Sequence, residues 1–296
     1  MAEHFVQPPQ WGWYIVGYFF CAGLAGGLYT LATMLGLSGS PRGEGTRRVA
    51  FLTTFPLVIV CGILLTIDLG QPLRFWHMMI DTTPGETGLN FKYWSPISIG
   101  TWALLIFGIF SFVSFLQALR HRGTGRPFEI VGSLVALFLA SYTGVVLSVS
   151  NQPVWSDSWA VGGLFVASAL SGSAALLSWL AHRAGDESSE PQLQLADAYF
   201  VLLEALMIVI FFVTLAQAGT LGKTFSGLWL VLWIVVFVSL IPGLRGLTGG
   251  RRLALASGSG SGVTTSAAAG MGMVSAIIVL LGVLLMRYVV IFSAQS

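Results

Sequence analysis

The protein has 296 residues, of which 55% are hydrophobic and only 9% are charged, whereas about 25% of the residues of an ordinary soluble domain are charged. These few polar groups cannot cover a water-exposed surface, so the composition excludes a soluble protein and indicates that lipid surrounds most of the chain. The net charge of +2 is too small and too scattered to indicate a nucleic-acid partner.

Apolar runs of about 20 residues, the length that crosses a bilayer, recur along the sequence. The first, Trp11–Leu37, is uncharged and longer than the core of a secretory signal, so we expect a retained first helix. Between the last two runs, Leu247–Gly262 is rich in Gly and Ser and is predicted to be a flexible loop. Within a single integral membrane domain, 1–296, the predicted spans are 13–37, 48–68, 96–119, 128–149, 158–182, 195–218, 224–244 and 264–291.

Lys and Arg are distributed unequally between the two ends of these spans. Ten lie in the loops that follow the first, third, fifth and seventh spans, and four lie elsewhere. Because cytoplasmic loops are enriched in Lys and Arg, both termini and the other loops are predicted to be extracytoplasmic. The ten are Arg42, Arg47, Arg48, Arg120, Arg122, Arg126, Arg183, Arg245, Arg251 and Arg252, and the four are Arg74, Lys92, Lys223 and Arg287.

Small residues recur at four-residue spacing in two of the predicted helices. Gly23 and Gly27 lie in the first, and Gly163, Ala167 and Ser171 lie in the fifth. Small side chains let helix backbones approach closely. The spacing fits either a contact face for a partner subunit or, as is more common, ordinary packing within the bundle.

The histidine and cysteine positions argue against a haem or a metal on this chain. Membrane cytochromes hold haem between axial His side chains inside their helices, but every His lies at or beyond the end of a predicted span. Cys21 and Cys61 lie in apolar runs without metal-ligand spacing, so we expect no disulfide framework and no cluster. The four histidines are His4, His77, His121 and His182.

Ionisable residues inside spans are costly in lipid and are therefore functional candidates. We identify Asp68 at the end of the second span, and Asp197 and Glu204 in the sixth. Seven residues separate Asp197 from Glu204, so they share one helix face about 10 Å apart. They could form part of a proton path. Alternatively, Glu204 is protonated and hydrogen-bonded between helices, and Asp197 lies at the membrane interface.

One rim of the predicted bundle gathers a carboxylate, an imidazole, a guanidinium and phenols, partly within the long loop Leu69–Ser95. Such a set suits a quinone, because His or Tyr can hydrogen-bond its carbonyls and a carboxylate can exchange its protons. Each residue alone also fits a role as a belt aromatic, a headgroup contact or an exposed loop residue. The predicted quinone-site residues are Tyr14, Tyr18, Asp68, Arg74, His77 and Tyr142, with Asp68 and His77 as the catalytic pair.

Four sequence blocks, together with the acidic pair of the sixth span, carry a family resemblance. The sequence resembles the NrfD/polysulfide reductase membrane-subunit family, the quinone-interacting anchors of iron–sulfur molybdoenzymes, over nearly its whole length. The second and third blocks together are the more specific. The blocks are Trp11-Gly12-Trp13-Tyr14 leading into Gly23–Gly27, Asp68–Trp76, Ser95–Trp102 and Tyr142–Leu147.

The resemblance implies an all-α, polytopic membrane protein of eight transmembrane helices, which we predict to form two packed four-helix bundles in a prokaryotic cytoplasmic (inner) membrane. It implies a haem-free subunit that binds quinone or menaquinone at its extracytoplasmic side, with Asp68, His77 and Tyr142 mapping best onto the pocket. It also implies a four-cluster ferredoxin-like iron–sulfur partner, which we expect to dock at 69–95, and a molybdopterin catalytic subunit.

Two other classes of function stay open at this point. The protein could be a proton- or ion-coupled transporter that uses Asp197 and Glu204, or a passive anchor that only tethers a catalytic partner.

Overall fold

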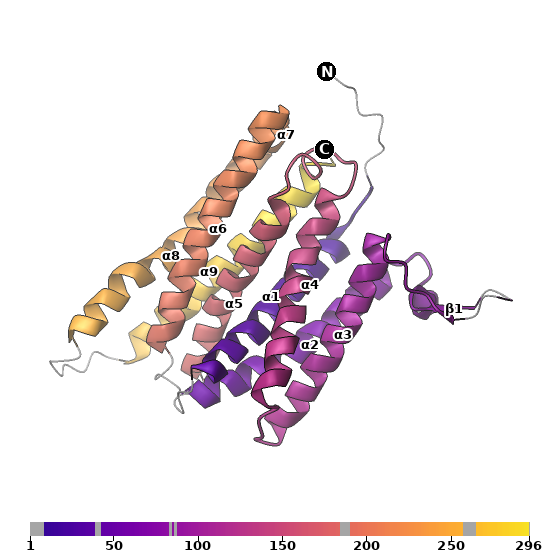
Figure 1. Ribbon diagram of the computed structural model, residues 1–296. Coiled ribbons are helices and arrows are strands. Elements are labelled where there is room, and N and C mark those ends of the chain that lie inside the picture. The colour runs from indigo at the N-terminus through magenta and orange to yellow at the C-terminus, as the bar shows by residue number, and fades with distance from the viewer. Residues whose placement is uncertain are drawn as a thin grey trace.

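The computed structural model describes residues 9–38, 43–82, 85, 88–183, 190–256 and 265–295. Nearly all of this described part is helical (Figure 1). The helices are α1 (Trp13–Leu37), α2 (Glu44–Asp68), η2 (Pro72–Met78), α3 (Pro96–Leu119), α4 (Arg126–Ser148), α5 (Val161–Arg183), α6 (Glu190–Ala218), α7 (Leu221–Thr224), α8 (Leu228–Ala256) and α9 (Thr265–Phe292). Strands β1 (Ile80–Asp81) and β2 (Gly88–Leu89) form an antiparallel pair in the long connection between α2 and α3.

Seven of these helices are long and apolar enough to cross a membrane. They are α1, α2, α3, α4, α5, the part of α6 from Leu193, and the part of α9 from Gly272. Helix α8 contributes a shorter apolar stretch, Leu228–Leu244. The architecture agrees with the predicted all-α polytopic membrane protein.

Helix α1 occupies the centre of the molecule. It packs against α2, α4 and α5 and also touches α9 (Figure 1). Helices α2, α3 and α4 pack in sequence on one side of it, while α5, α6, α8 and α9 form a closed series of neighbours on the other. Most of α1 is therefore buried against protein rather than exposed to lipid.

The small residues of α1 serve this internal packing. A Cβ atom added at Gly27 would lie 2.7 Å from the backbone oxygen of Ala169 and would collide with the Ser173 hydroxyl, both on α5. Only a glycine permits so close an approach of the two helices. The spacing of Gly23 and Gly27 thus reflects packing within the bundle, and not a contact face for a partner.

The start of α1 and the end of α9 lie at the same end of the bundle (Figure 1). The backbone N–H of Trp11 donates to Gln295 Oε1 at 2.8 Å, and Gln295 Nε2 donates to the carbonyl of Trp11 at 3.2 Å. This pair of hydrogen bonds joins the segment before α1 to the residues after α9.

The structure differs from the sequence-based prediction at the C-terminal end of α8. The segment 247–262 is predicted to be a loop, but α8 continues to Ala256, and 257–262 lie outside the described residues. Residues 251–256 read Arg-Arg-Leu-Ala-Leu-Ala, and Arg, Leu and Ala have high helix propensity. Their propensity outweighs the Gly and Ser content that predicts a loop.

Candidate functional site

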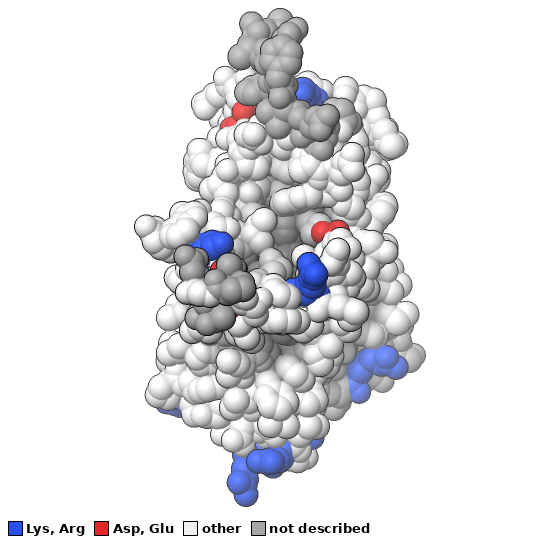
Figure 2. Space-filling view, turned by 90° about the vertical axis from the view of Figure 1, so that its right-hand side faces the viewer, with Lys and Arg blue, Asp and Glu red and all other residues white. Residues whose placement is uncertain are grey.

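A cavity of about 790 Å³ lies between α1, α2, α3 and α4 at the end of the bundle that carries both termini. Its walls include Ile15 near the start of α1, Asp68 at the end of α2, Ile97 at the start of α3, and Val146 near the end of α4. Figure 2 views the side of the molecule that carries the β1–β2 connection and shows a hollow there, with charged side chains around it. The volume falls within the range of about 300–1,000 Å³ that is typical of small-molecule sites.

Most of the cavity lining is apolar. Aliphatic and aromatic side chains of α2 and α3 form much of its walls. A lining of this kind favours a ligand with a large apolar surface and few polar groups. The polar side chains of the lining are Tyr18, Thr66, Asp68, Thr101 and Tyr142.

The hydroxyl groups of the lining differ in whether they already donate a hydrogen bond within the protein. Thr66 and Thr101 donate to carbonyl oxygens one turn earlier in their own helices, at 2.7 and 2.9 Å. Tyr142 donates to the carbonyl oxygen of Pro96. Tyr18 is only 4% exposed, and its hydroxyl makes no hydrogen bond to any described residue. Because buried hydroxyls normally have a partner, Tyr18 has a donor to offer a ligand in the cavity.

Asp68 places a carboxylate on the rim of the same cavity. Helix α2 ends there because Leu69 is extended and Pro72 follows. A negative charge at a helix C-terminus is unfavourable to the helix dipole, so the carboxylate does not serve to stabilise α2. Among the described residues no ion pair neutralises it. Asp68 is therefore available to exchange protons with a bound molecule.

The structure brings Tyr18, Asp68 and Tyr142 together around the cavity, as expected for three of the six predicted quinone-site residues. The other three do not line it. Tyr14 is 48% exposed on the outer side of α1. The remaining pair lies on η2.

Arg74 and His77 lie on η2, which runs past the rim of the cavity. The His77 ring stacks on Trp76 with 3.7 Å between ring centroids, and its Nδ1 lies 3.3 Å from the carbonyl oxygen of Arg74. The two residues that follow His77, Met78 and Met79, line the cavity instead. His77 is thus adjacent to the cavity in sequence, with its ring stacked outside the lining.

A second group of ionisable side chains is buried between α5, α6 and α9. Glu204 is 1% exposed and lies fourteen residues from either end of α6. It interacts electrostatically with Asp197 on its own helix and with Arg287 of α9. One oxygen of each acid, Asp197 Oδ1 and Glu204 Oε2, has no hydrogen-bond partner in the described part of the protein. Glu204 is therefore fully buried, whereas Asp197 is partly exposed.

Arg287 is a buried charged residue, and the sequence analysis did not place it among the candidate site residues. Its inclusion among the four Lys and Arg residues of the extracytoplasmic loops and termini is wrong, because the side chain is fully buried. Its guanidinium donates to the carbonyl oxygens of Phe165 and Val283 and lies 5.0 Å from the centre of the Phe165 ring. In the sequence, the position of Arg287 inside the apolar run 264–291 could have indicated that its side chain is buried. Without it the charge bias becomes ten against three and keeps its direction.

Two aromatic rings separate the cavity from this buried charged group. Phe19 lines the cavity, and its ring centroid lies 6.0 Å from that of Phe165. The other neighbour of Phe165 is the guanidinium of Arg287. The cavity and the buried ionisable residues thus lie on either side of an apolar partition.

The helices and the cavity define a class: a polytopic membrane protein with a largely apolar cavity at one end of its bundle. The family model described as Polysulphide reductase, NrfD matches residues 3–296, and the chain belongs to this family. It is therefore an integral membrane protein and, by family, a membrane subunit of a respiratory oxidoreductase.

Three curated relatives share this similarity. The component designated C of the polysulfide reductase of Wolinella succinogenes is 28% identical over an alignment of 321 residues, gaps included. The alignment covers 97% of this chain and 94% of the relative. Protein NrfD of Escherichia coli is 27% identical over 248 residues, spanning 75% and 76%. The component designated C of the selenate reductase of Mesobacillus selenatarsenatis is 32% identical over 77 residues, spanning 26% and 18%.

Proposed function

We propose that this chain binds quinone or quinol in the cavity between α1 and α4 and passes electrons between the quinone and a peripheral iron–sulfur subunit. The observation that carries the proposal is the apolar cavity of about 790 Å³ with an unpartnered Tyr18 hydroxyl and an unpaired Asp68 carboxylate in its lining, as far as the described residues extend. Because both groups converge on one apolar space, they suit a ligand that is mostly apolar and has a few oxygen atoms.

Each residue has a defined role in this proposal. The Tyr18 hydroxyl donates a hydrogen bond to a quinone carbonyl and so orients the ring. Oxidation of a quinol to a quinone releases two protons and two electrons. The Asp68 carboxylate accepts these two protons one after the other and releases each to the aqueous side, since it lies on the rim. The two electrons pass to the iron–sulfur partner.

Partner docking is proposed at the connection 69–95. This segment exposes large apolar side chains beside the cavity rim: Leu73 is 90% exposed, Leu89 76% and Tyr93 73%. Exposed apolar side chains that cluster in this way mark interaction sites. Two relatives are named as single lettered components of reductases, which indicates that they belong to multi-subunit complexes. We assign to this surface a four-cluster ferredoxin-like iron–sulfur subunit, with a molybdopterin catalytic subunit beyond it.

The proposed topology has eight spans in two packed four-helix bundles, α1 to α4 and α5, α6, α8 and α9. The series of packed neighbours supports the two bundles, and the shared position of both termini supports an even count. The surplus of Lys and Arg at the opposite end supports an orientation with both termini and the cavity on the extracytoplasmic side of a prokaryotic cytoplasmic membrane.

Proton movement through the bundle is proposed along Asp197 and Glu204, with Arg287 as the third member. The burial of Glu204 and Arg287 and the electrostatic interaction of Glu204 with Asp197 and Arg287 support the proposal, since buried ionisable groups in membrane proteins mark proton relays. A transporter that needs no quinone would use the same residues. Proton transport by the purified protein in liposomes without quinone would favour that second function.

A cavity-filling substitution tests the quinone site. Gly62 lines the cavity, and a Cβ added there would meet nothing within 4 Å, so Gly62→Leu places a side chain in the open space. We expect this variant to fold and to lose binding of a short-chain naphthoquinone, measured by quenching of tryptophan fluorescence. Gly222→Leu on α7 is the matched control, because Gly222 has equal room and lies outside the lining.

Both variants are also assayed for quinone-linked turnover in the assembled complex. Unchanged quinone binding and turnover in Gly62→Leu would remove the cavity as the site. Partner binding with no response to quinone in the wild type would instead identify the protein as a passive anchor.

A further inference from the structure

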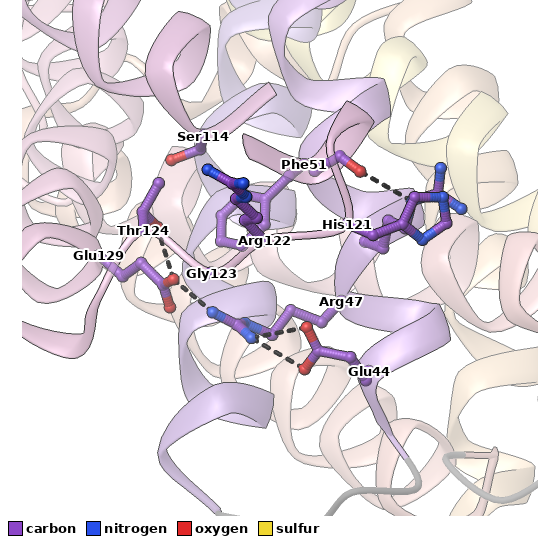
Figure 3. Close-up of a pocket in the computed structure, with 11 residues that line it drawn as sticks. Glu44, Arg47, Phe51, Ser114, His121, Arg122, Gly123, Thr124 and Glu129 are labelled. Carbon is purple, nitrogen blue, oxygen red and sulfur yellow. Dashed lines mark hydrogen bonds and ion pairs between the residues drawn. The ribbon is translucent and has the colours of Figure 1, made fainter. Parts of the chain in front are cut away.

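A second, smaller pocket lies at the opposite end of the same helices. It has a volume of about 100 Å³ and is formed by the first turns of α2, the last turn of α3, the connection to α4 and the buried Glu129 (Figure 3). Because α2 runs from this pocket to Asp68, the two pockets lie at opposite membrane surfaces. The proposed quinone function gives no role to this second pocket.

The carboxylates of the pocket are already committed to one arginine. Arg47 forms ion pairs with Glu44, at 2.9 Å, and with Glu129, as Figure 3 shows. Thr124 also donates to Glu129, at 2.6 Å. These contacts join α2 to α4 and engage both carboxylates, and because three arginines and two glutamates line the pocket, its net charge is +1 with His121 neutral.

The other basic side chains of the pocket are left without an acidic partner. Arg48 and Arg122 line it and pair with no carboxylate among the described residues, and His121 adds an imidazole N–H (Figure 3). The guanidinium groups of Arg48 and Arg122 therefore give the pocket donors for an anion.

Arg48 is already held in place for binding. Its Nε donates to the carbonyl oxygen of Ala118 on α3 at 2.8 Å, which fixes the guanidinium across the gap between two helices. The remaining nitrogens of a guanidinium fork match the oxygen atoms of a phosphate group. A donor that is held before binding loses less conformational freedom on binding.

The depth of the pocket agrees with the phosphate layer of a bilayer. Helix α2 has 25 residues and is therefore about 37 Å long, whereas the hydrocarbon core is about 30 Å thick. The first turn of α2 thus extends into the headgroup region. The small volume admits a headgroup and excludes an acyl chain, since a site of about 10–15 Å³ holds one water molecule.

We propose that this pocket binds an anionic phosphate group, held by Arg48, Arg122 and His121. Basic pockets between transmembrane helices on the cytoplasmic side bind anionic lipid headgroups in this way. The phosphate belongs either to a phospholipid or to a free phosphate from the aqueous phase, and the experiment separates these sources.

The test measures the thermal unfolding midpoint of the purified full-length protein in detergent. The probes are phosphatidylglycerol, a diacylglycerol with the same acyl chains but no phosphate, and inorganic phosphate. We expect phosphatidylglycerol to raise the midpoint of the wild type, and Arg48→Gln and Arg122→Gln each to need about fivefold more lipid for the same rise. Arg126→Gln is the matched control, because Arg126 begins α4 next to the pocket but does not line it.

Each outcome decides the proposal. A response to phosphatidylglycerol alone that the two variants weaken supports a lipid headgroup, and a response to inorganic phosphate that they also weaken supports a free phosphate. An equal response of the wild type and both variants, an equal effect of diacylglycerol, or no response of the wild type overturns the proposal. If Arg48→Gln does not fold, Arg122→Gln carries the test, since the Arg122 side chain makes no hydrogen bond to a described residue.

Discussion

Tyr14 and Tyr18 lie one turn apart on α1, yet they face different surroundings. Tyr14 is 48% exposed and lies outside the cavity, whereas Tyr18 is 4% exposed and lines it. The two residues are chemically identical, so their contribution to ligand binding depends only on the direction in which each side chain points. This pair of tyrosines offers a comparison within one helix.

Tyr18→Phe should weaken quinone binding by about threefold to tenfold, because it removes one hydrogen bond with a net contribution of about 0.5–1.5 kcal/mol. Tyr14→Phe removes the same atom outside the cavity and should leave the affinity unchanged. Titration of both purified variants with a short-chain naphthoquinone measures the difference. Equal affinities would show that the Tyr18 hydroxyl does not contact the ligand.

The buried ionisable residues show which features of a single residue can be predicted from the sequence and which cannot. Glu204 and Asp197 can be identified from the sequence as candidate functional residues, because a carboxylate inside an apolar run is unusual whichever face of the helix carries it. The burial of Arg287 cannot be predicted in the same way, because a basic residue near the end of a span normally extends its side chain to the interface. Its burial depends on the carbonyl of Phe165 and on the room beside Gly23, and both lie on other helices.

The helices themselves were predictable, because an apolar run of sufficient length has no alternative structure in lipid. The predicted spans overlap all seven candidate spans of the structure. The cavity was not predictable in the same way, since it requires knowing which faces of α1 to α4 meet. Its polar lining residues come from four helices, and sequence spacing fixes only faces within one helix.

The contact between α1 and α5 depends on glycine at position 27. Gly27→Ala should lower the free energy of unfolding by about 1–3 kcal/mol, because a methyl group would be forced against the backbone of Ala169. Thermal or denaturant unfolding of the purified protein measures the loss. Gly62→Ala is the control on α2, where a Cβ meets nothing within 4 Å and alanine favours the helix. Equal stability of the two variants would contradict the packing argument.

At the scale of the whole molecule, the two termini lie together and the basic loops lie at the opposite end. Figure 2 shows Lys and Arg side chains gathered at the lower end of the viewed face. The charge bias and the shared position of the termini favour one orientation in the membrane. This orientation decides which compartment the cavity opens toward.

An alkaline phosphatase fused after Ser296 should therefore be active, since that enzyme matures only outside the cytoplasm. The same reporter inserted in the connection between α3 and α4 should be inactive, because the connection carries Arg120, Arg122 and Arg126. The two fusions are compared at equal expression. The reverse pattern would place the Asp68 cavity on the cytoplasmic side.

The central position of α1 has a consequence for how the protein is made. Helix α1 is synthesised before all four helices that pack against it, α2, α4, α5 and α9, and α9 follows the others. The hydroxyls of Tyr29 and Thr33 find partners on α3 and α4, respectively. The nascent α1 therefore lies in the bilayer without these interhelical partners until α3 and α4 have followed it. Its burial against protein is complete only after α9 has also been inserted.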